Sequence, residues 1–157
     1  MSCISYRCFE GQPEAQVIDW IAELNQELFG FNETSEHLST FFQAQTRVFI
    51  CLAFDEERVV GFKIGVEDAP RSFESWRGGV VDTARRQGIA TELLQLQHSW
   101  CELHGFRVIK TTTNNSNIPM LILNLRNGFQ VVGSFVNQNK RLKLLLEKWL
   151  VPSKDSS

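Results

Sequence analysis

The chain has 157 residues, of which 43% are hydrophobic and 22% charged, as expected for one ordinary globular domain. Its 16 basic and 18 acidic residues give a net charge of -2, so the basic excess typical of nucleic-acid-binding proteins is missing. No apolar run is long enough to span a bilayer and no signal-peptide pattern opens the sequence, which favours a cytoplasmic protein without nucleic-acid or membrane partners.

The first half of the chain carries strand and helix signals in turn. Residues Ile4 to Glu10 read as a short strand, and apolar positions at helical spacing predict a helix from Pro13 to Gly30. A weaker helix is expected from Ser35 to Gln45. Two runs rich in β-branched and aromatic residues, Arg47 to Phe54 and Val59 to Val66, flank a polar turn and predict an antiparallel hairpin.

The second half continues with single elements that alternate in type. A strand is expected at Glu74 to Val81, and a long helix runs from Gly88 to a terminating glycine at Gly105. Gly78 and Gly79 inside the strand favour a bulge or the close approach of another backbone. The remaining expected elements are a strand at Phe106 to Thr112, a helix at Asn117 to Arg126, and two strands at Phe129 to Val136 and Leu142 to Leu150.

This order of elements predicts a mixed α/β domain in which helices pack on a central sheet. No internal repeat and no linker interrupts the chain, so residues 1–151 are expected to form one domain. Residues 152–157 form a polar tail that we expect to be frayed. Four cysteines without C-x-x-C spacing, and without a close Cys/His pair, predict free thiols and no metal site.

The segment from Val80 to Thr91 lies where a strand ends and a long helix begins. The first N–H groups of a helix have no internal partner, and the helix dipole adds positive potential there, so such a start can bind an anion. Gly88 has no side chain to keep a phosphate from the backbone, and Arg85 and Arg86 add positive charge. These features predict a loop that wraps a pyrophosphate.

The spacing Arg85-x-x-Gly88-x-Ala90 resembles the Q/R-x-x-G-x-G/A signature of the GNAT superfamily of N-acetyltransferases, in which this loop binds the pyrophosphate of CoA. The chain lacks the phosphate-binding motif of nucleoside triphosphatases and the G-x-G-x-x-G dinucleotide motif. In the family a bulged strand precedes the signature, and here Gly78-Gly79-Val80 occupy that place. An asparagine that opens a later helix and a Gly-Phe pair follow, here Asn117 and Gly128-Phe129.

The resemblance extends over nearly the whole chain and is most specific from Trp76 to Val132. It implies a single domain with a mostly antiparallel sheet of about seven strands, splayed fourth and fifth strands, and helices on both faces. It also implies acetyl-CoA as co-substrate and a small-molecule amine or a peptide as acceptor. The cofactor-binding residues that it implies are Gly79, Val80, Val81, Arg85, Arg86, Gln87, Gly88, Ile89, Ala90, Thr91 and Asn117.

Direct transfer to an amine requires a base, because the amine arrives protonated near neutral pH. Glu67, near the end of one predicted strand, is our first candidate for that base, and Glu74, at the start of the next, is the second. Asp68 and Asp82 are weaker candidates, a water chain could also serve, and each carboxylate could instead be solvated or attract a cationic substrate.

Many members of the family carry a tyrosine four residues before the Gly-Phe glycine, and that tyrosine protonates the departing thiolate. Asn124 occupies this position here, and an amide can hydrogen-bond to sulfur but cannot supply the proton. The thioester oxygen needs a donor, which the resemblance places in the backbone near Val80. His98 falls off the apolar stripe of its helix and is expected to be solvated.

Two other interpretations use the same loop. The chain could be a non-catalytic module that binds or senses acyl-CoA, or a nucleotide-binding protein that holds a different phosphate. Phe31, Phe41 and Phe42 could line an apolar acceptor pocket, although we expect at least one of them to pack in the core. The sequence carries no motif for the acceptor, and a homodimer is possible.

Overall fold

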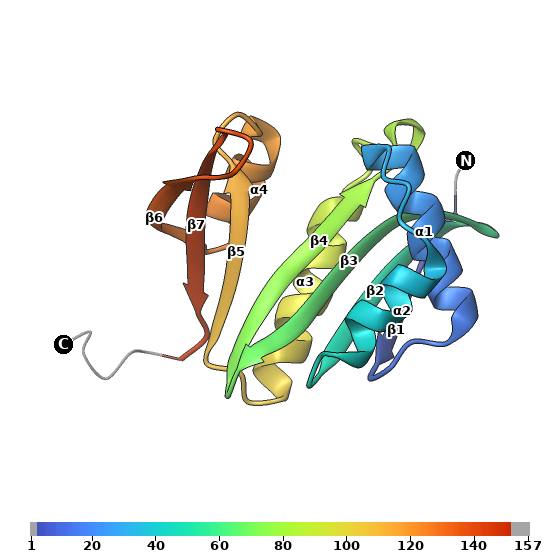
Figure 1. Ribbon diagram of the computed structural model, residues 1–157, viewed down its shortest axis with the longest axis horizontal. Helices are drawn as coiled ribbons and strands as arrows, with labels where there is room; N and C mark the ends of the chain where they lie inside the picture. The colour runs from blue at the N-terminus through green and yellow to red at the C-terminus, as the bar shows by residue number, and fades with distance from the viewer. Residues whose placement is uncertain (1–2, 152–157) are drawn as a thin grey trace.

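The computed structural model describes residues 3–151, in which seven strands form one sheet and four helices pack on it (Figure 1). The strands are β1 (Ile4–Glu10), β2 (Val48–Asp55), β3 (Arg58–Ala69), β4 (Ser72–Val80), β5 (Val108–Asn114), β6 (Gln130–Val136) and β7 (Leu142–Trp149). The helices are α1 (Ala15–Phe29), α2 (Ser35–Gln43), α3 (Ile89–Leu103) and α4 (Ile118–Arg126), with a short 3-10 turn at Asp82–Ala84 before α3.

The strand order in the sheet is β1-β2-β3-β4-β5-β7-β6. Every neighbouring pair is antiparallel except β4 and β5, which run parallel. The predicted element order and the mixed, mostly antiparallel sheet are therefore confirmed. The tail expected at residues 152–157 lies outside the described residues.

The boundaries of two elements near α3 differ from the prediction for local reasons. Phe106 was expected to begin a strand, but its N–H donates to the carbonyl of Cys101 at 3.0 Å and so still belongs to the end of the helix. Strand β5 therefore begins at Val108. Gly88 precedes α3 as its N-cap with φ of +77°, a left-handed conformation that favours glycine.

Opposite faces of the sheet are covered by different helices (Figure 1). A Cβ atom placed on Gly61 of β3 would meet Ile89 and Leu93 of α3 at 3.3 and 3.4 Å. A Cβ atom on Gly79 of β4 would instead meet Leu28 of α1 at 2.8 Å. We call these two sides the α3 face and the α1 face, and side chains along each strand alternate between them.

The bulge of β4 lies at Trp76, two residues before the predicted Gly78-Gly79. Ile64 of β3 pairs with Arg77, but the next residue, Gly65, pairs with Ser75, so Trp76 is the extra residue. As a result the side chains of Trp76 and Arg77 both contact groups on the α1 face. Of the two alternatives expected for the glycine pair, the close approach of another backbone is confirmed, because a Cβ atom on Gly78 would be only 2.9 Å from the carbonyl oxygen of Phe62. The bulge lies at Trp76 instead.

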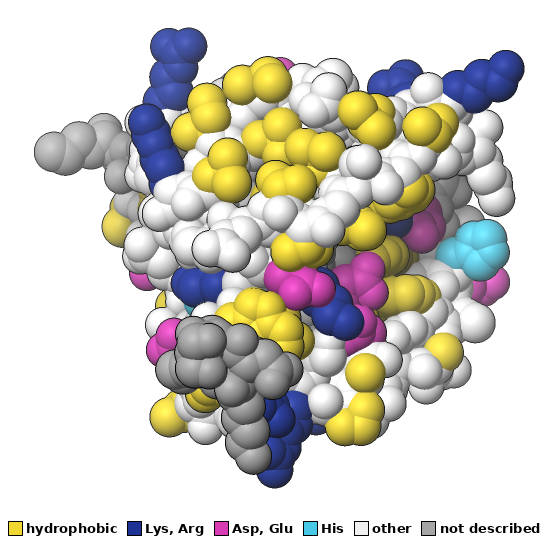
Figure 2. Space-filling model, turned by 90° about the vertical axis from the view of Figure 1, so that its left-hand side faces the viewer, with side chains coloured by type: hydrophobic (Ala, Val, Ile, Leu, Met, Phe, Trp, Pro, Cys, Tyr) yellow, Lys and Arg dark blue, Asp and Glu magenta, His cyan; other side chains and the backbone are white. Residues whose placement is uncertain are grey.

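The hydrophobic core is concentrated in the first four strands. Every residue from Val48 to Phe54 in β2 is buried, because the strand is central and both of its faces are covered. In β6 every residue except Gly133 is exposed. The end of the molecule formed by β6 and β7 therefore shows many hydrophobic side chains on its surface (Figure 2).

Candidate active site

Strands β4 and β5 separate partway along their length. Strand β4 has nine residues, but only Ser72–Glu74 pair with β5, opposite Val108–Lys110. Beyond this point the strands diverge, and the wedge between them opens toward the loop before α3 (Figure 1). At the start of the wedge, Thr111 Oγ1 donates a hydrogen bond of 3.1 Å to the carbonyl of Ser75. The splay between the fourth and fifth strands is therefore present.

Two cavities border β5 and share the lining residues Thr111 and Thr112. The first, which we call the splay cavity, has a volume of about 170 Å³. The second, which we call the acidic cavity, has a volume of about 330 Å³. The splay cavity is lined by Lys63, Ser75, Trp76, Arg77, Gly78, Thr111, Thr112, Thr113, Asn114, Asn117, Met120 and Lys143. The acidic cavity is lined by Asp68, Glu74, Lys110, Thr111, Thr112, Val132, Leu145, Leu146 and Glu147.

Two backbone N–H groups of β4 point into the splay. The N–H of Val81 donates to the carbonyl of Val60 on β3 at 2.9 Å, so these two residues form a hydrogen-bonded pair of the ladder. In an antiparallel ladder, the backbone N–H and C=O groups of every second residue pair point away from the partner strand. Gly78 and Val80 belong to those alternate pairs, so their N–H groups point away from β3 and toward the splay.

A third cavity, of about 200 Å³, lies at the loop that precedes α3. The N-terminus of α3 has no side-chain cap, and its first recorded internal bond runs from the Glu92 N–H to the Gly88 carbonyl. The N–H groups of the first turn therefore remain available to a ligand. This loop cavity is lined by Val80, Ala84, Arg85, Arg86, Gly88, Ile89, Ala90 and Thr91.

Arg85 contacts the loop itself. Its guanidinium pairs with Asp82 at 2.7 Å, and its Nε donates to the carbonyl of Val80 at 3.2 Å. These contacts fix the turn between β4 and α3, and the Arg86 backbone adopts a positive φ of 64° within it. Of the other predicted cofactor residues, Asn117 caps α4 and lines the splay cavity. Gly79, Val81 and Gln87 line none of these three cavities.

Glu74 lines the acidic cavity and is the last residue of β4 that pairs with β5. It pairs in the sheet with Val66 and Lys110 and is half-buried. Burial, and secondarily the nearby Asp68, raise the pKa of Glu74, while Lys110 opposes that effect. A carboxylate with a raised pKa is a stronger base than an ordinary glutamate, so Glu74 is suited to accept a proton from an amine.

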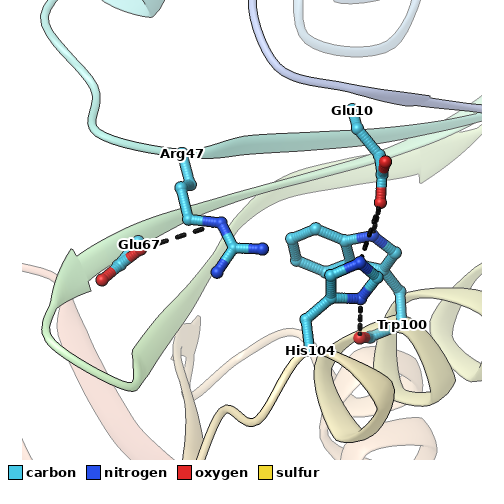
Figure 3. Close-up of polar contacts among 5 residues, drawn as sticks. All are labelled: Glu10, Arg47, Glu67, Trp100 and His104. Atoms are coloured by element: carbon cyan, nitrogen blue, oxygen red, sulfur yellow. Dashed lines mark hydrogen bonds and ion pairs between the residues drawn. The ribbon is translucent and has the colours of Figure 1, made fainter.

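Glu67 lies away from the splay, on the α3 face near the end of β3 (Figure 3). Its carboxylate is 4.0 Å from Arg47 Nε, and the Arg47 guanidinium lies over the ring of Trp100 at 5.1 Å. On the same side, Glu10 accepts a hydrogen bond from Trp100 and pairs with His104 at 3.2 Å. Glu67 thus belongs to a polar cluster around the end of α3, and unlike Glu74 it lines none of the three cavities.

Asn124 is buried inside α4 and does not line the splay cavity. Its Nδ2 donates to Thr113 Oγ1 of β5 at 3.3 Å, so the amide joins the helix to the sheet. Thr113 itself lines the splay cavity. Asn124 is therefore placed behind the cavity wall, one side chain away from the space between the strands.

His98 is buried, contrary to the solvated position expected from its helix. Lys148 Nζ donates to His98 Nδ1 at 2.9 Å, and the Phe129 ring centre is 5.4 Å from that of the imidazole. Burial, Lys148 and Lys63 lower the pKa of His98 to about 3, so the ring is neutral at physiological pH. The apolar spacing of α3 did not predict the burial of His98, because β7 and the segment at Phe129 cover that side of the helix only in the folded protein.

The aromatic side chains expected near the acceptor have separate roles. Phe42 is completely buried, whereas Phe41 stacks on Trp76 with ring centres 4.0 Å apart. Arg77 lies over the same Trp76 ring at 4.1 Å and pairs with Glu33 at 2.7 Å. This group stands on the α1 face beside the bulge of β4, so it forms a wall next to the splay.

Two other kinds of feature are absent from residues 3–151. There, no group of three or more His, Cys, Asp or Glu side chains could hold a metal ion. No helix in the same part of the chain is long and apolar enough to cross a membrane.

Solved structures with the same fold are acetyltransferases of low sequence identity. The ribosomal-protein-S18-alanine N-acetyltransferase from Escherichia coli is 12% identical with a TM-score of 0.77, and the match covers 96% of this chain and 99% of that one. Ard1 from Thermoplasma volcanium is 13% identical with a TM-score of 0.79, over 95% and 99% of the two chains. PaiA N-acetyltransferase from Thermoplasma acidophilum, solved with coenzyme A, is 15% identical with a TM-score of 0.72, over 94% and 99%.

Sequence comparison defines the family. No curated protein gives a significant match to the sequence. Residues 15–129, however, match the family described as "Acetyltransferase (GNAT) family", and this range spans β2–β5 together with the loop before α3. Since the match covers well over half of the chain, the protein belongs to the acetyltransferase (GNAT) family, whose enzymes take an acetyl group from acetyl-CoA.

Proposed function

We propose that the protein binds acetyl-CoA along the loop cavity and the splay, and passes the acetyl group directly to an amine that enters from the acidic cavity. The observation that carries this proposal is that Thr111 and Thr112 line both the splay cavity and the acidic cavity. A thioester held in one cavity and an amine held in the other could therefore come into contact at the wedge where the two strands separate.

In this reaction Glu74 takes a proton from the bound ammonium group, which frees the nitrogen lone pair to attack the thioester carbonyl. The N–H groups of Gly78 and Val80 are positioned to donate to the carbonyl oxygen as negative charge develops on it. The C–S bond then breaks, the electron pair stays on sulfur, and the products are an amide and CoA. The loop before α3 holds the pyrophosphate with its free N–H groups.

The acceptor proposed here is a cationic amine. Asp68, Glu74 and Glu147 line the acidic cavity with only one lysine, Lys110, whose ammonium is 3.9 Å from Asp68. Excess negative charge attracts a protonated amine and disfavours an anionic substrate. A small amine and a peptide with a free amino group both meet this requirement, and a screen over both classes would separate them.

Two further proposals concern location and assembly. The four free cysteines, Cys3, Cys8, Cys51 and Cys101, support a reducing compartment such as the cytoplasm, and cell fractionation tests this. Exposed apolar side chains on the edge strand β6 support a homodimer, which light scattering tests.

Binding of acetyl-CoA is tested by calorimetric titration of Gly88→Trp, with Gly105→Trp as its matched control. Both glycines have φ of +77°, and a Cβ atom placed on either would meet no atom within 4 Å, so both variants carry the same backbone strain at opposite ends of α3. We expect micromolar binding to the wild type and to Gly105→Trp, and none to Gly88→Trp. Equal binding to both variants, or none to the wild type, would overturn the proposed cofactor site.

Turnover is tested by following thiol release with an acceptor from the amine screen. We expect Glu74→Gln to lower kcat/KM by about 100-fold or more, since general bases contribute about 10²–10⁴. Glu67→Gln, on the other side of the sheet, should change it less than about threefold on the same scale. A large loss in Glu67→Gln and a small one in Glu74→Gln would instead assign the role of base to Glu67.

A non-catalytic acyl-CoA-binding module is the second candidate function. It is favoured by Asn124, which is buried and holds Thr113 where the family's general acid is expected. This alternative predicts tight acetyl-CoA binding but no thiol release with any amine.

A further inference from the structure

Lys63 of β3 extends across the neighbouring strand toward the splay. It pairs with Gly78 of β4, in one of the pairs that exchange no backbone hydrogen bonds and whose side chains lie closest together. A Cβ atom on Gly78 would be 2.9 Å from Lys63 Cδ, so the lysine stem occupies the space left by the glycine. Only glycine at position 78 lets the side chain of Lys63 run this way, and Lys63 is one of the residues that line the splay cavity.

The ammonium of Lys63 has no hydrogen-bond or ion-pair partner within residues 3–151, although the side chain is partly buried. The other charged residues that line the cavity are Arg77 and Lys143, and no carboxylate lines it. Two buried polar atoms of residues that line this cavity also lack partners among the described residues: Ser75 Oγ and Asn114 Oδ1. A cavity with cations and unsatisfied polar atoms is completed by a ligand that accepts hydrogen bonds and carries or develops negative charge.

The charged and titratable groups around Lys63 favour loss of the proton from its ammonium group. His98 of α3 faces it as a neutral ring, Lys148 of β7 lies behind that ring, and Lys143 of β7 and Arg77 of β4 line the same cavity. Burial lowers the pKa of Lys63 to about 8. A free thiol has a pKa of about 8.5, so a proton can pass between the two groups with little free-energy change.

We propose that Lys63 is the residue that stabilises the departing CoA thiolate and returns its proton. This proposal rests on the proposed acetyl transfer. When the C–S bond breaks and sulfur keeps the electron pair, the Lys63 ammonium donates a proton to sulfur, which yields the CoA thiol and a neutral amine on Lys63. The lysine then regains a proton from water, so the enzyme is restored and no other reactant is consumed.

Lys63 provides the releasable proton that the amide of Asn124 cannot supply. The amide of Asn124 has no proton to release at neutral pH and is already bound to Thr113 behind the cavity wall. Lys63 comes from another strand, so the acid function has moved from the α4 side of the cavity to the β3 side. Sequence position gives no sign of this, because the relation between Lys63 and Gly78 exists only once β3 and β4 are in register.

The first test measures the thiol pKa of bound CoA, which needs no acceptor amine. Coenzyme A is titrated onto the wild type, Lys63→Met and Lys140→Met, and thiolate absorbance is followed against pH. A nearby cation lowers an acid's pKa by about one to three units, so the bound thiol should titrate at least about one unit higher in Lys63→Met than in the wild type. Lys140 is an exposed turn residue, and its variant should match the wild type.

The second test compares kcat across pH in the wild type and Lys63→Met. The ratio of the two rates should be about tenfold or more at pH 7 and approach one above about pH 9, since only the protonated lysine acts and general acids contribute about 10²–10⁴ in full. Lys63→Arg keeps the charge without a releasable proton, so it should restore the low thiol pKa but not the rate. If Lys63→Met does not fold, Lys63→Gln takes its place.

The outcomes separate this proposal from the proposed function. If the wild type does not bind coenzyme A, the cofactor site itself fails. If it binds and transfers acetyl groups, but Lys63→Met shows the wild-type thiol pKa and the wild-type rate at every pH, the role of Lys63 is overturned. A uniform rate loss without any change of the ratio with pH would also overturn it, because that result indicates a structural role.

Discussion

The two parts of the sheet on either side of the splay differ in how they are stabilised. In the first part, β1–β4 with α1–α3, the central strand β2 is buried along nearly its whole length. In the second part, β5–β7 with α4, exposed apolar side chains cover much of the surface (Figure 2). Its buried apolar side chains are few: Val108, Ile109, Phe129 and Leu146. The first part therefore contains most of the hydrophobic core, and the second forms a less buried wall beside the splay.

The largest contrast is expected from matched phenylalanine deletions. Phe62 of β3 is fully buried, whereas Phe135 of β6 is 43% exposed. Phe62→Ala should lower the free energy of unfolding by about 3–5 kcal/mol through lost burial and a cavity, and Phe135→Ala by less than about 1 kcal/mol. Urea denaturation measures both. Equal losses would show that the second part has a core of its own or that another surface covers it.

The contact between the two parts makes stability depend on pH. The pKa of His98 is lowered to about 3 in the folded protein, so below its ordinary value the unfolded chain binds the proton more readily. Stability should therefore fall as pH drops below about 6.5, by up to about 2 kcal/mol at pH 5. His98→Gln should flatten this dependence between about pH 6.5 and 5 in urea unfolding curves. An unchanged slope would assign the acid sensitivity to other groups.

Within the second part, one buried hydrogen bond joins α4 to β5. Asn124→Ala removes the donor to Thr113 and leaves that hydroxyl without its partner, which should cost about 1–2 kcal/mol of unfolding free energy. Acetyl-CoA affinity should weaken as well, because Thr113 lines the splay cavity. Asn124→Ser, which keeps a hydrogen-bonding group, should lose less. A stable variant with normal affinity would mean that the wall does not need this contact.

The smallest effect is expected at the exposed face of β6. Val136 is 64% exposed, and Val136→Thr keeps its branched shape, so stability should change by less than about 0.5 kcal/mol. Thermal unfolding and light scattering on the same sample check this. A loss above about 1 kcal/mol together with dissociation of an oligomer would show that a second copy buries this face.

Much of this architecture followed from local patterns in the sequence. Helices α1 and α3 were predicted from their apolar spacing, because each buries one face. Strands β2 and β3 were predicted from their β-branched runs, because central strands are buried on both faces. The glycine-started helix after β4 also predicts the loop with free N–H groups, since positive φ at Gly88 and an uncapped helix start are local properties.

The contents of the site depended on strand register and on packing between distant segments. The bulge at Trp76, rather than at the glycines, places Trp76 and Arg77 together on the α1 face. Glu67 and Glu74 are close in sequence, yet they lie on opposite faces, because strand side chains alternate and a hairpin turn separates the two residues.

The sequence by itself therefore determined the element order, the family signature and the start of α3, all of which depend on residues within a few turns of one another. Only the tertiary structure decided that His98 is buried, that Glu74 faces the acidic cavity, and that Lys63 reaches the splay over Gly78. The physical reason is that burial and charge environment arise from side chains far apart in the chain, and these meet only when the sheet is assembled in register.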